Sequence, residues 1–112
     1  MKFPVIQKDC SDEKLQKRLV DTCRGIGDVQ QNQTNVQASM TNWYMHETDV
    51  DFMQVCETAI QLAYDNSPSM PIVALMPYDC WGAIYTKGNY AKSHDHWSQI
   101  WSWVYNVQCC EN

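Results

Sequence analysis

The residues of this chain best suited to chemistry are two histidines two positions apart, His94 and His96. On a β-strand, side chains at i and i+2 point to the same face, so both imidazoles can bind one metal ion while Asp95 faces away. Two such ligands and a third from elsewhere leave coordination positions open for a substrate or dioxygen. The spacing predicts a site for Fe, Zn, Cu or Ni, with a chance surface pair as the alternative.

The residues before the pair predict how it is positioned. Residues 81–86 form a strand candidate, and the Lys-Gly-Asn run at 87–89 is typical of a turn. Tyr85 and Tyr90 lie on either side of this turn, where their hydroxyls can bind a cosubstrate or their rings can pack in the core. His46 is a further candidate ligand, but a hydrogen-bonded structural histidine is the preferred interpretation.

The same stretch resembles a known family. The residues that carry the resemblance follow the pattern Tyr85-x-x-Gly88-x-Tyr90-x-x-x-His94-x-His96 and then Trp101-Ser102-x-x-Tyr105-x-Val107. This pattern is similar to the 2-oxoglutarate/Fe(II)-dependent oxygenases of tailed phages of marine bacteria, which are distant relatives of prolyl 4-hydroxylases. A Gly with His-x-His six residues on also looks like the first motif of cupins, which share the double-stranded β-helix, or jelly-roll, fold.

The resemblance covers about residues 78–110 and implies a hydroxylase that uses Fe(II) and the co-substrate 2-oxoglutarate on a small-molecule or peptidyl substrate. It implies that His94 is the first iron ligand. His96 stands where most of the superfamily has Asp or Glu, and an imidazole does not offset the charge of Fe(II) as a carboxylate does. The family's distal histidine and the basic residue that pairs with 2-oxoglutarate are expected beyond Asn112.

Two other classes of function compete with this one. A cupin-like phage module would bind a metal, or serve a structural role, without turnover. A phage interaction protein would use the aromatic face of the chain as an interface; the chain has five Trp and six Tyr.

Two amphipathic helices are predicted before the motif. Ser11 or Asp12 can cap the first, which runs to about Cys23 and stops at the following glycines. Thr48 is the expected cap of the second, over about 49–65, with an acidic residue at the capping-box position. The second helix carries an apolar stripe that we expect to be buried, made of Phe52, Cys56, Ile60 and Ala63.

The other segments predict short strands. Residues 28–42 are rich in polar side chains and predict a loop or a weak edge strand, in which Val36, Ala38 and Met40 alternate with polar neighbours. Further strands are expected over 72–76, 81–86 and 100–107, the last with Trp101, Trp103, Tyr105 and Val107 on one face.

The predicted fold class is therefore α+β, with N-terminal helices packed on an incomplete jelly-roll sheet. The 112 residues are expected to form a single truncated domain, helical over about 1–67 and β-rich over about 70–112. Three or four strands with two open edges make an unusual end to a domain, which is why a longer protein is expected.

Composition excludes several partners. The net charge of −5 argues against nucleic acid, because phosphate binding needs clustered Lys and Arg. No apolar run is long enough to span a membrane, and the polar start is unlike a signal peptide. A cytoplasmic location is expected, in the host cytoplasm if the source is a phage. The six cysteines are accordingly expected to be free thiols rather than a disulfide framework.

Overall fold

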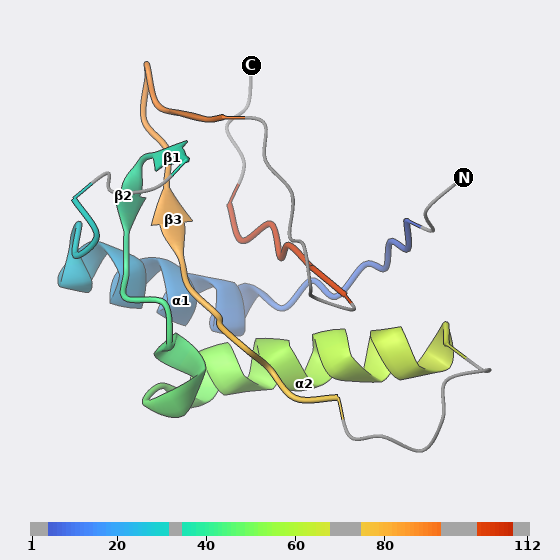
Figure 1. The fold of residues 1–112 in the computed structure, drawn as a ribbon. Helices are drawn as coiled ribbons and strands as arrows, with labels where there is room; N and C mark the ends of the chain where they lie inside the picture. Colours follow the sequence, from blue (N-terminus) through green and yellow to red (C-terminus); the bar gives the residue numbers. More distant parts are fainter. Residues whose placement is uncertain (1–4, 32–34, 68–74, 93–100, 109–112) are drawn as a thin grey trace.

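The structure is a computed structural model that describes residues 5–31, 35–67, 75–92 and 101–108. Two helices and two small antiparallel sheets make up these ranges, so the described chain is an α+β globule. Figure 1 shows the two long helices side by side, running in opposite directions, with the strands on one side of them. No helix in the described ranges is long and apolar enough to cross a membrane.

The first helix, α1, spans Glu13–Ile26 and begins as predicted. The Asp12 carboxylate accepts a hydrogen bond from the Leu15 amide at 3.1 Å, which satisfies one of the free amides of the first turn. Leu15 and Leu19 point into the core from one face. The helix continues past the predicted end at Cys23 and stops at Gly27, whose φ of 75° is one that glycine adopts without strain.

The second helix, α2, spans Val50–Asp65, and its cap differs from the prediction. Asp49, not Thr48, is the N-cap: its carboxylate accepts hydrogen bonds from the amides of Asp51 and Phe52 at 2.9 and 3.1 Å. A carboxylate at this position satisfies two free amides and lies favourably in the field of the helix dipole.

The neighbouring Asp51 carboxylate is not used in a capping box. It pairs instead with the Arg18 guanidinium of α1, 3.1 Å away, and so links the two helices. The predicted apolar stripe of α2 is buried in its first half, at Phe52 and Cys56. Ile60 and Ala63 are half-buried, so their predicted burial was wrong: the last turns of α2 extend beyond the elements that cover the first ones.

Replacing Asp49 with Ala is expected to lower the free energy of unfolding by about 1 kcal/mol, because two α2 amides lose their acceptor. Urea denaturation of the variant measures this difference. Thr48→Ala is the matched control and should change the stability by less than about 0.5 kcal/mol. A larger loss for Thr48→Ala than for Asp49→Ala would contradict the cap assignment.

Both small sheets pair the segment 36–40 with the segment 83–91, and we call these two paired segments the ribbon. β1 (Val36–Gln37) pairs with β4 (Tyr90–Ala91), and β2 (Ser39–Met40) pairs with β3 (Ala83–Ile84), both antiparallel. The predicted alternation in the first strand is confirmed, since Val36, Ala38 and Met40 are all buried. The ribbon thus joins a segment of the first half of the chain to the segment that precedes the histidine pair.

The core has two parts. The larger lies between the helices, the short 3-10 helix η1 (Met45–Glu47) and the segment before β3. Its buried members are Leu15, Leu19, Met45, Phe52, Val55, Cys56 and Cys80. The smaller lies under the ribbon, where Val36, Ala38 and Met40 pack with Trp81 and Ala83. Thr41 connects them, since its amide donates to the Gly82 carbonyl and its hydroxyl accepts from the Gly82 amide, both at 3.0 Å.

Two predicted strands differ from the structure. Residues 101–108 belong to no strand. They lie against α1 instead, where the Gln16 side chain donates to the Val107 carbonyl at 3.1 Å and the Tyr105 hydroxyl donates to the Cys10 carbonyl at 3.2 Å. The strand predicted over 72–76 lies mostly outside the described residues, and its described end, Leu75 and Met76, is not in a strand.

Candidate functional site

The predicted metal ligands, His94 and His96, lie outside the described residues, which break off after Lys92 and resume at Trp101. The structure does describe the chain that leads into them. In β4 this chain is paired with β1, and the Lys92 amide then donates to the Asn35 carbonyl at 2.7 Å. The backbone is therefore extended and hydrogen-bonded up to the second residue before His94.

The turn predicted before β4 is confirmed. Gly88 has a φ of 91°, which a residue with a Cβ adopts only with strain. The Asn89 amide donates to the Thr86 carbonyl at 2.9 Å, and the Asn89 side-chain oxygen accepts from the Thr86 amide at 2.8 Å. Because the turn closes on itself through Asn89, it fixes where the chain enters β4.

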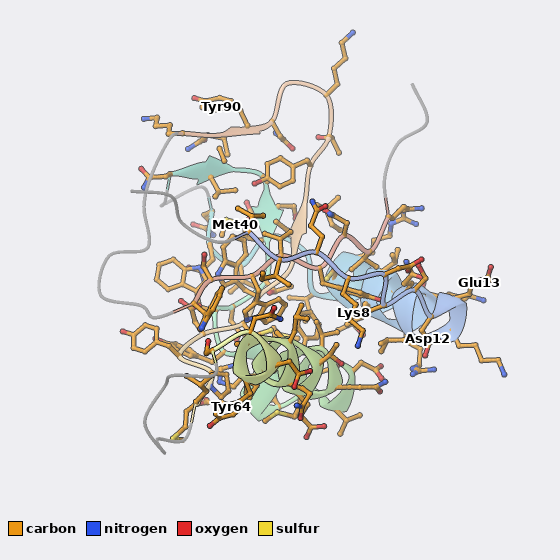
Figure 2. The ribbon with its side chains drawn as sticks, turned by 90° about the vertical axis from the view of Figure 1, so that its right-hand side faces the viewer. Lys8, Asp12, Glu13, Met40, Tyr64 and Tyr90 are labelled. Carbon is orange, nitrogen blue, oxygen red and sulfur yellow. The ribbon has the colours of Figure 1, made fainter. Side chains whose placement is uncertain are left out.

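Tyr85 and Tyr90 both lie on the surface, with 48% and 53% of their area exposed. The interpretation of these rings as core residues is therefore wrong. Figure 2 shows Tyr90 at the part of the ribbon farthest from both helices, whereas Met40 lies inward, above the helices. Aromatic residues near strands are more often packed in a core, but the ribbon has no second layer over this end in the described chain. Their phenol groups are free to meet a ligand.

His46 occupies η1 and is 8% exposed. Its Nδ1 atom has no hydrogen-bond partner within the described residues, so the expected hydrogen-bonded histidine is wrong for this atom. An unpaired buried nitrogen costs desolvation free energy, on the order of 1–3 kcal/mol. No sequence signal marked this atom, because the burial of η1 arises from its packing on α2.

Three cysteine side chains converge in the larger part of the core. Cys56 of α2 is wholly buried, Cys80 is 5% exposed, and Cys23 of α1 is half-buried against them. The predicted burial of Cys56 in the apolar stripe of α2 is thus confirmed. All four cysteines in the described ranges, Cys10 included, are free thiols.

Cys56 and Cys80 influence each other's ionisation in this part of the core. A hydrogen bond from the Cys80 thiol lowers the pKa of Cys56, because the S–H group stabilises its thiolate. The same bond, together with burial, raises the pKa of Cys80 above its ordinary value. Burial also raises the pKa of Cys23. Sequence reasoning missed the pair, since the two cysteines are far apart in the chain and form no recognised spacing.

The described ranges contain no group of three His, Cys, Asp or Glu side chains that could hold a metal ion. A hollow between the start of α1 and the middle of α2 lies in the helical layer rather than at the ribbon; it is lined by Cys10, Ser11, Asp12, Leu15, Gln54, Val55, Thr58 and Tyr105. The described residues that come directly before the predicted metal ligands in the chain are those of the turn and of β4.

No protein-family model, curated protein sequence or solved structure matches this chain. The assignment of a site consequently depends on the histidine spacing, on the resemblance that surrounds it, and on the ribbon that leads into it.

Proposed function

We propose that this chain carries the front part of a 2-oxoglutarate/Fe(II)-dependent oxygenase core, with His94 and His96 as iron ligands. The observation that supports the proposal most directly is the extended backbone up to Lys92, held by its hydrogen bond to Asn35. An extended chain that continued to residue 96 would carry both imidazoles on one face. In this proposal the ribbon is the beginning of a jelly-roll sheet whose other strands come from the rest of the protein.

The donors at the proposed site suit the metal. Neutral imidazole nitrogens bind Fe(II) well, and two of them leave positions for a third ligand and for 2-oxoglutarate. When bound, iron and 2-oxoglutarate supply the activation of dioxygen for hydroxylation of a C–H bond. This chain would hold the iron and orient the co-substrate. His94 and His96 would bind the iron through their nitrogen lone pairs. The exposed hydroxyls of Tyr85 and Tyr90 would donate hydrogen bonds to the 2-oxoglutarate carboxylates.

The position of His96 favours a second candidate. A carboxylate there would offset part of the charge of Fe(II), and an imidazole leaves that charge on the metal. A softer, all-nitrogen site binds Zn, Cu or Ni as readily as iron. The second candidate is therefore a cupin-like module that binds a metal without turnover.

Titration of the chain with Co(II), a spectroscopic substitute for Fe(II), tests the ligands. His94→Ala and His96→Ala are each expected to weaken Co(II) binding by about tenfold or more, which is at least about 1.4 kcal/mol. Asp95→Ala is the matched control in the same segment and should change the affinity by less than about threefold, or about 0.7 kcal/mol. Unchanged affinity in His94→Ala would overturn both candidate functions.

The cobalt complex of the longer protein that this proposal implies, with its third ligand and basic residue, separates the two candidates. In the oxygenase, adding 2-oxoglutarate should change the visible spectrum of bound Co(II). Tyr90→Phe should then weaken the 2-oxoglutarate affinity while the Co(II) affinity stays the same. In the binding module the spectrum does not respond to 2-oxoglutarate at any concentration.

A further inference from the structure

We draw no further inference here: the strongest candidate, the hollow between the start of α1 and the middle of α2, is lined by exposed polar side chains such as Asp12, Gln54 and Thr58, and nothing in the part of the chain that the structure describes shows what ligand would fill it.

Discussion

Phe52→Ala is expected to lower the free energy of unfolding by about 3–5 kcal/mol, among the largest effects of any single substitution in this chain. Phe52 is 5% exposed and lies in the larger part of the core, beside Gly82 and the cysteines. Truncation to Ala leaves a cavity in place of the ring, and the neighbouring side chains can fill it only if α2 or the ribbon moves. Guanidinium or urea denaturation, followed by circular dichroism, measures the loss.

Val50→Ala is the control for Phe52→Ala, because it shortens an aliphatic side chain of α2 that is 84% exposed. It should change the stability by less than about 0.5 kcal/mol. Equal effects of the two substitutions would mean that the first turn of α2 is not packed as described. A Phe52→Ala variant that is wholly unfolded in buffer would show a loss larger than expected, since domains of this size are stable by about 5–15 kcal/mol.

Gly82→Ala is expected to cost about 1–3 kcal/mol through overpacking. A Cβ atom at this position would lie 2.5 Å from the Cys23 sulfur and 3.4 Å from the Phe52 ring, and the first distance is too short for any stable contact. The backbone of Gly82 cannot shift away freely, because it is hydrogen-bonded through both its amide and its carbonyl to Thr41. Thermal unfolding of the variant measures the cost as a lower melting temperature.

Two companions test the cause of this loss. Cys23→Ala combined with Gly82→Ala should recover much of the stability lost in Gly82→Ala alone, because the clashing sulfur is gone; a double-mutant cycle gives the coupling. Gly25→Ala is the matched glycine control in α1, with no atom within 4 Å of the added Cβ. It should raise the stability, by about 0.5–1 kcal/mol. A loss in Gly25→Ala, or no coupling between positions 23 and 82, would contradict the packing described.

The candidate site was predicted in part. The Gly88 turn followed from local chemistry, since a Lys-Gly-Asn run can supply a positive φ and an Asn side-chain acceptor within a few residues. The shared role of His94 and His96 stays a prediction drawn from their spacing. The exposure of Tyr85 and Tyr90 did not follow from the sequence, because an alternating strand pattern does not say which face another layer covers.

The features that the sequence determined by itself are those that depend on residues close together in the chain. The apolar faces of both helices, the Asp12 cap, the end of α2 at Asn66 and the alternating burial of 36–40 all follow from contacts within a few residues. Errors of local reasoning were small and concern where a helix begins or ends. The α2 cap moved from Thr48 to Asp49 because a carboxylate accepts from two amides better than a hydroxyl does.

Tertiary structure decided which of the locally possible forms was taken. Residues 101–108 have a strand pattern, yet they lie against α1 through side-chain hydrogen bonds, because a strand requires a neighbouring strand to bond with. Ile60 and Ala63 continue the stripe of α2 but reach past the elements that bury Phe52. Cys56 and Cys80 belong to the same part of the core although they lie far apart in the chain. Such contacts depend on how whole elements pack, and no window of neighbouring residues contains that information.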